Sequence, residues 1–140
     1  MKKFLLFISL FVVKYSFSQI NVSDIGKKTI YEVKNAFSIS PCEDDEQIIT
    51  YCVENGSRIS YLFKNKILDG ILTMTAFSTQ YAAEKELELE VSKKKASTGI
   101  EPIVSGGKTW FFTSDSPIFV TFSVEYVNRT YYMVFYVARQ

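Results

Sequence analysis

The sequence predicts an α+β protein in which two helices pack on one face of an antiparallel, hairpin-connected β-sheet. The expected order is α-β-β-β-α-β-β-β, with room for one extra short strand. Residues 117–139 contain two runs of β-branched and aromatic residues around Asn128-Arg129, which indicates an antiparallel hairpin. Asn55-Gly56 separates two further apolar runs, and residues 78–96 are rich in helix-forming Ala, Glu, Lys and Leu. Helices on one side of a hairpin sheet suit this pattern.

The N-terminal segment has the features of an export signal. A basic Met1-Lys2-Lys3 start precedes an apolar run from Phe4 to Val13, which is too short to span a bilayer as a helix. Ser16-Phe17-Ser18 places small residues at the two positions that a signal peptidase reads. We therefore expect a cleaved signal peptide at residues 1–18 and a single α+β domain at 19–140. An uncleaved anchor is the alternative.

The charge of the expected mature chain argues against nucleic acid as a partner. The chain has 16 basic and 15 acidic side chains. The signal contains Lys2, Lys3 and Lys14 and no acid, so residues 19–140 keep 13 basic and 15 acidic side chains, a net charge of −2. Binding to a phosphate backbone needs a basic surface, which this composition does not indicate. We expect an exported protein, periplasmic or secreted, with no stable membrane anchor after cleavage.

The chain has two cysteines, Cys42 and Cys52. In an oxidising compartment such a pair is typical of a disulfide that closes a short loop. Two buried free thiols are the rival interpretation, because spacing alone does not distinguish them.

The first half of the mature chain is expected to begin with a helix at residues 23–37. Ser23 or Asp24 suits its N-cap, apolar residues recur near helical spacing, and Pro41 follows its end. The acidic run 43–46 lacks the alternating oxygen spacing and the glycine of a calcium loop, so a solvated turn is the better interpretation.

Three strands are predicted to follow, at residues 48–53, 58–64 and 67–77. The Asn-Gly turn joins the first two, and Asn65-Lys66 is a tight turn before the third. Gly70 inside the third strand indicates a bulge or the close approach of another element.

The second helix is predicted over residues 78–96. Ala83, Leu87 and Val91 form an apolar stripe at helical spacing, and Gly99 suits the C-terminal stop. Glu90 and Lys94 have the spacing and order of a helical ion pair. Residues 87–91 also alternate as a strand would, but the flanking propensity favours a helix.

The remaining chain is predicted to be sheet. Residues 103–104 and 108–113 flank a turn at Ser105-Gly106-Gly107. Trp110 and Phe112 then share one strand face. The hairpin of residues 117–139 follows.

The residue types exclude several kinds of chemistry. The chain has no histidine, which removes Ser-His-Asp and Cys-His catalysis and the commonest metal ligand. We predict no catalytic residue, no metal site and no cofactor. Carboxylate chemistry through Asp69, Asp115 or Glu125 keeps a hydrolase formally open.

Aromatic residues are concentrated in the last strands, where most are expected to fill the core. If one sheet face is left uncovered, its aromatics can meet a partner. Tyr132, Val134 and Tyr136 share one strand face and are the candidate binding patch. We therefore expect a non-catalytic interaction module, an inhibitor or envelope accessory protein whose partner is a protein or envelope component. The alternatives are a carrier of a small hydrophobic ligand or lipid, and a carboxylate-based hydrolase.

Overall fold

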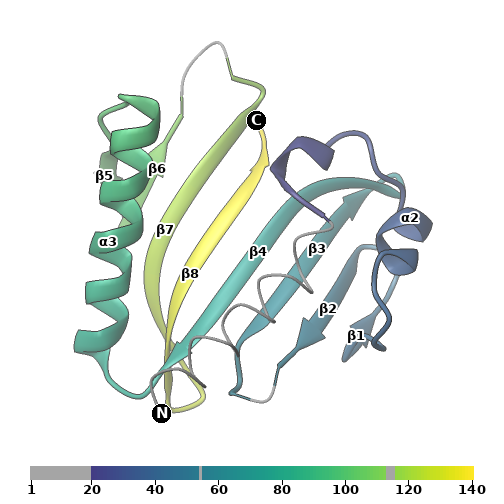
Figure 1. The fold of residues 1–140 in the computed structure, drawn as a ribbon, viewed down its shortest axis with the longest axis horizontal. Coiled ribbons are helices and arrows are strands. Elements are labelled where there is room, and N and C mark those ends of the chain that lie inside the picture. Colours follow the sequence, from purple (N-terminus) through teal and green to yellow (C-terminus); the bar gives the residue numbers. More distant parts are fainter. Residues whose placement is uncertain (1–19, 54, 113–115) are drawn as a thin grey trace, which may run out of the picture.

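In the described part of the chain, eight strands form a single antiparallel sheet in the order β1-β2-β3-β4-β8-β7-β6-β5 (Figure 1), which confirms the predicted α+β class. The computed structural model describes residues 20–53, 55–112 and 116–140. The helical elements are the 3-10 turn η1 (Val22–Asp24), α2 (Ile30–Asn35) and α3 (Gln80–Thr98). The strands are β1 (Glu43–Asp44), β2 (Ile48–Cys52), β3 (Arg58–Lys64), β4 (Ile67–Phe77), β5 (Ile103–Ser105), β6 (Lys108–Phe111), β7 (Ile118–Val127) and β8 (Thr130–Arg139). The expected signal peptide lies outside the described residues.

The predicted helix at residues 23–37 is wrong in extent. Gly26 has φ +82°, and its N–H donates to the carbonyl of Leu68 at 2.7 Å, so the chain leaves helical geometry there. The N–H of Leu68 in turn donates to the carbonyl of Lys28 at 2.8 Å. The start of β4 lies beyond the end of β8, and this segment pairs with its unpaired edge. Sheet pairing thus outweighs local helix propensity, and α2 begins only after its own N-cap, Thr29.

The acidic run at residues 43–46, predicted to be a solvated turn, forms a short strand as well as a turn. Its first two residues form β1, which pairs with β2 through Glu43 opposite Thr50. The turn itself is made by Asp45, whose carboxylate accepts hydrogen bonds from the N–H groups of Gln47 and Ile48 at 2.7 and 2.9 Å. Strand β1 was not predicted, because two acidic residues have low strand propensity. Strand β5 is the extra short strand that the predicted order allowed.

The two halves of the chain meet where β4 pairs with β8 at the centre of the sheet. Gly70 permits this pairing, since a Cβ there would lie 3.1 Å from the carbonyl oxygen of Val137 and 3.3 Å from the Cβ of Ala138. The register between β3 and β4 also shifts beside Gly70, between Leu62 and Phe63. Both predicted roles of this glycine, a bulge and a close approach, are therefore present.

Helix α3 begins and ends close to the predicted positions. Thr79 caps its N-terminus, and Gly99 stops it with φ +68°. Ala83 is buried, and Leu87 and Val91 pack against the core, as the predicted stripe requires. The predicted ion pair of Glu90 with Lys94 is wrong. Glu90 instead forms an ion pair with Lys93, one residue nearer, with 2.8 Å between the ammonium nitrogen and the carboxylate oxygen. On an exposed helix surface both spacings are within reach.

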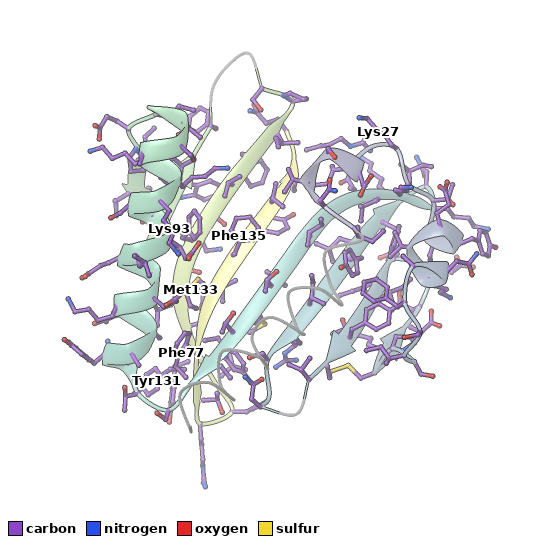
Figure 2. All side chains as sticks on the ribbon, in the orientation of Figure 1. Lys27, Phe77, Lys93, Tyr131, Met133 and Phe135 are labelled. Atoms are coloured by element: carbon purple, nitrogen blue, oxygen red, sulfur yellow. A yellow bond between two sulfur atoms is a disulfide. The ribbon has the colours of Figure 1, made fainter. Side chains whose placement is uncertain are left out.

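We call one side of the sheet the core face, because its strand residues belong to the buried hydrophobic cluster. These residues alternate in register across the sheet and meet helix side chains such as Val33, Leu87 and Val91. Figure 2 shows Phe77 of β4 and Tyr131, Met133 and Phe135 of β8 along the strip next to α3. The strand members of the cluster are Ile49, Tyr51, Ile59, Tyr61, Phe63, Leu68, Ile71, Phe111, Val120, Phe122, Met133 and Val137.

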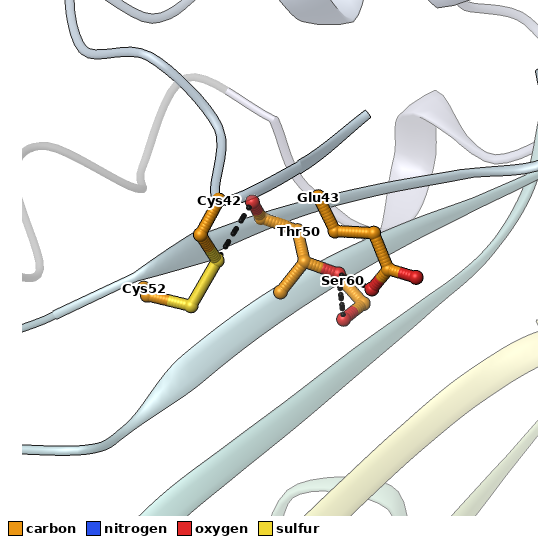
Figure 3. The surroundings of a disulfide bond; sticks show 5 residues. All are labelled: Cys42, Glu43, Thr50, Cys52 and Ser60. Carbon is orange, nitrogen blue, oxygen red and sulfur yellow. Dashed lines mark hydrogen bonds between the residues drawn. A yellow bond between two sulfur atoms is a disulfide. The ribbon is translucent and has the colours of Figure 1, made fainter. Parts of the chain in front are cut away.

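A disulfide joins Cys42 and Cys52, with their Cα atoms 5.9 Å apart (Figure 3), as predicted. It links the segment before β1 to the end of β2. The N–H of Cys42 donates to the carbonyl of Thr50 at 2.8 Å. The Sγ of Cys42 lies 3.3 Å from the same oxygen, but an oxidised sulfur carries no proton, so this is a contact rather than a hydrogen bond. The disulfide thereby holds the two-residue strand β1 against the sheet.

Replacing Cys42 and Cys52 together by Ser is expected to lower the free energy of unfolding by about 2–3 kcal/mol, because the unfolded chain gains loop entropy. Urea denaturation of residues 19–140, oxidised and reduced, measures this difference. The reduced wild-type chain should unfold at the same urea concentration as the double variant. Equal midpoints for the oxidised chain and the variant would show that the disulfide contributes nothing to stability.

The core contains one polar atom that lacks a partner. The Tyr61 ring is fully buried, near the rings of Phe37 and Tyr51. Among the described residues, its hydroxyl is the only buried side-chain polar atom without a hydrogen-bond partner, and burial raises the pKa of this hydroxyl. Desolvating an unpaired hydroxyl costs stability.

Replacing Tyr61 by Phe is therefore expected to raise the free energy of unfolding by about 1 kcal/mol, since it removes an unpaired buried donor. Thermal or urea unfolding measures the change. Tyr51→Phe is the matched control on the neighbouring ring and should change stability little, because that hydroxyl is not an unpaired buried atom. Marked destabilisation by Tyr61→Phe would mean that a buried water or ligand bonds the hydroxyl.

Candidate functional site: the aromatic face

The side of the sheet opposite the core face carries the candidate patch, and we call it the aromatic face. Its register row across the centre of the sheet runs from Ser60 through Leu72, Tyr136 and Thr121 to Trp110. In the described part of the chain, the helix side chains that join the hydrophobic cluster meet strand residues of the core face. The aromatic face is defined by Trp110, Phe119, Tyr132, Val134 and Tyr136.

Tyr132, Val134 and Tyr136 lie on this one face of β8, but they differ in accessibility. Tyr132 is only 6% exposed, and the guanidinium of Arg58 lies over its ring, 5.5 Å from the ring centroid. Val134 and Tyr136 are half-buried. Residues Met133 and Val137, on the other side of the same strand, are buried in the core. Tyr136 and Val134 are therefore the accessible members of the predicted patch.

A continuous row of rings extends this patch toward the edge of the sheet. The ring of Tyr136 meets that of Phe119 edge to face, with centroids 5.7 Å apart, and Phe119 lies 5.7 Å from Trp110. Desolvation by this packing, and then the charge of Asp69, raise the pKa of the Tyr136 hydroxyl. The hydroxyl therefore stays protonated and can donate a hydrogen bond across the physiological pH range.

Small polar side chains are buried on the same face of the sheet. Thr121 and Ser123 of β7 and Thr50 and Ser60 of β2 and β3 are all buried on the aromatic face. The hydroxyls of Thr50 and Ser60 lie 2.8 Å apart, and that of Thr50 also donates to Glu43 at 3.1 Å (Figure 3). These hydrogen bonds hold β1, β2 and β3 together from the side opposite the core.

A shallow hollow of about 470 Å³ lies at the β5 end of the aromatic face. Trp110 is one of its lining residues, and the indole N–H of Trp110 donates to the carbonyl of Ser105 at 3.3 Å. Sequence reasoning missed this hollow, although it placed Trp110 and Phe112 on one face. The sequence signal that could have indicated it is the pair of apolar residues Ile103 and Val104 in a short strand beside the Gly-Gly turn. The lining residues are Ile103, Ser105, Gly106, Lys108, Trp110 and Phe112.

A carboxylate-based hydrolase would need its acidic side chains close together, and the two candidates that the structure describes, Asp69 and Glu125, lie far apart. Glu125 accepts a hydrogen bond from Ser123 at 3.1 Å, near the β7–β8 turn. Asp69 forms an ion pair with Arg139 at 2.7 Å, toward the other end of β8. Glu125 lies opposite Tyr132, and Gly70, the neighbour of Asp69, lies opposite Ala138, so the two carboxylates are at least six residues of strand, about 20 Å, apart. Asp115 lies outside the described residues.

Within the described ranges, no cluster of three or more His, Cys, Asp or Glu side chains is arranged to hold a metal ion. None of the described helices is long and apolar enough to cross a membrane. Comparisons of the chain with protein-family models, with curated proteins and with solved structures give no match.

Proposed function

We propose that this chain is an exported, non-catalytic interaction module, an inhibitor or envelope accessory protein, that binds a protein partner through its aromatic face. The observation that carries the proposal is the row of rings from Tyr136 through Phe119 to Trp110. Aromatic side chains that already pack on one another lose little conformational freedom on binding, so they are effective anchors at protein interfaces. The disulfide is consistent with an oxidising, extracytoplasmic compartment.

The difference in burial between the two sides of the sheet supports this proposal. Tyr51, Tyr61 and Leu68 are almost fully buried there, whereas the large side chains of the aromatic face, Tyr132 excepted, stay partly exposed. A side-chain layer that remains half-exposed in the isolated chain gains further burial when a partner covers it. The partner is expected to be a protein or another envelope component rather than nucleic acid.

A carrier of a small hydrophobic ligand or lipid is the second candidate. It is favoured by the apolar lining of the hollow beside Trp110, of about 470 Å³. A carrier site normally encloses most of its ligand, whereas this hollow lies at the sheet edge, lined by a three-residue strand and a turn. A flat contact with a protein surface therefore fits it better than an enclosed ligand.

The test uses immobilised residues 19–140 to capture proteins and lipids from the source cell's envelope extract. One stoichiometric protein should be retained by the wild-type chain and lost with Tyr136→Ser. Tyr132 is a poor probe, because replacing a buried ring by Ser costs about 3 kcal/mol or more of stability. Tyr31→Ser on α2 is the matched control, since that ring is 63% exposed on another surface.

Retention of the partner by Tyr136→Ser at wild-type stoichiometry would contradict the proposal. Co-purified lipid without a protein partner would instead support the carrier. Circular dichroism and the unfolding midpoint of each variant show whether lost binding reflects lost folding.

A further inference from the structure

Among the strands that the structure describes, none pairs with the outer side of the edge strand β5. Gly106 and Gly107 have φ values of +60° and +72°, typical of a two-residue hairpin turn between Ser105 and Lys108. In such a hairpin the residues that flank the turn form a hydrogen-bonded pair, so the next pair, Val104 and Thr109, does not. The N–H and C=O of Val104 therefore point away from β6, toward the free edge of the sheet.

The side chains around this edge are unusually exposed for apolar residues. Val104 is 75% exposed, Ile103 is 52% exposed and Phe112 is 47% exposed. The exposure of Val104 shows that α3, which lies on the same side of the sheet, leaves the edge accessible. Ile103 and Phe112 also line the hollow beside Trp110. An unpaired strand edge and an apolar hollow thus lie side by side.

Lys108 adds a positive charge to the same place. It lies opposite Ser105 on β6, and it also lines the hollow. Among the described residues, Lys108 forms none of the ion pairs, whereas four other lysines each hold a carboxylate. Because Ser105 is small, the ammonium group can reach across it to a strand added at the edge.

We propose that the β5 edge binds an extended polypeptide segment with the pattern acidic–x–apolar, which pairs antiparallel with β5. This inference rests on the proposed function and names its partner more closely. The middle residue of the segment exchanges two backbone hydrogen bonds with Val104. The acidic residue then lies beside Ser105 and pairs with Lys108. The apolar residue lies beside Ile103, with its side chain over the hollow and Trp110.

Neither the other edge nor a second copy of the chain offers the same site. Strand β1 at the opposite edge consists of Glu43 and Asp44, which repel an acidic segment. Antiparallel pairing of β5 with β5 of a second copy would place Ser105 opposite Ile103 and leave Lys108 without an acid. Pro102 lacks an N–H and so limits the added strand to a short segment.

The test measures binding of a fluorescein-labelled peptide, with Glu-Val-Phe at its centre, to residues 19–140 by fluorescence anisotropy. Binding is expected to weaken about ten-fold with Lys108→Glu, which turns attraction into repulsion. N-methylation of the central Val should abolish binding, since it removes the N–H that donates a hydrogen bond to the carbonyl of Val104. The reversed peptide, Phe-Val-Glu, should also bind more weakly. Lys64→Glu, at a distant exposed site, is the matched control and should bind as wild type does.

No binding of the Glu-Val-Phe peptide, or binding that neither Lys108→Glu nor N-methylation weakens, would overturn the proposal. Sedimentation that shows a dimer dependent on Val104 would also overturn it, in favour of a second copy as the occupant. A captured envelope protein that is lost with Tyr136→Ser and kept by Lys108→Glu would refute this edge site while leaving the interaction module intact.

Discussion

The pairing of β4 with β8 at the centre of the sheet is the constraint on which the rest of the structure depends. It joins the last strand of each half over the registers Gly70–Phe77 and Tyr131–Ala138, so two four-stranded units become one sheet. The two strands are far apart in sequence, and their pairing closes a long loop that contains α3. Gly70 keeps the backbones close, and Asp69 joins Arg139 at the same end of the pair. The segment around Gly26 then pairs with the part of β4 that β8 does not reach.

In this arrangement the two sides of the sheet and its two edges carry different kinds of side chain. The hydrophobic cluster lies on the core face, where Tyr51, Tyr61 and Phe122 pack with apolar residues of the helices and the N-terminal segment. The aromatic face keeps larger, half-exposed rings above small buried hydroxyls. Both edge strands are short, which limits uncontrolled sheet extension. One edge is acidic, whereas the other combines apolar side chains with a lysine, so the two edges differ in charge and polarity.

Local sequence signals predicted most of the sheet but not the N-terminal segment. The bounds of β3 and β4 agree with the apolar alternation, and positive φ at Asn65-Lys66 and Asn128-Arg129 matches the predicted tight turns. The helix at residues 23–37 was wrong because its pattern carries no information about the free end of β4, a partner forty residues away in the chain. Strand β1 was missed for a similar reason, since a disulfide and a neighbouring strand hold two acidic residues extended.

The candidate patch was predictable only in part. Alternation placed Tyr132, Val134 and Tyr136 on one face, but the burial of Tyr132 under Arg58 arises from a strand two positions away in the sheet. The hollow beside Trp110 depends on which strand forms the edge, and strand order cannot be read from periodicity.

The most direct test of the aromatic face as the accessible side of the sheet is hydroxyl-radical footprinting of folded residues 19–140, read by mass spectrometry. We expect strong modification of Trp110 and Tyr136, which are partly exposed. We expect little modification of Tyr51 and Tyr61, which are almost fully buried on the core face. Protection of Trp110 and Tyr136 equal to that of Tyr61 would show that both faces of the sheet are covered, and would contradict a partner surface there.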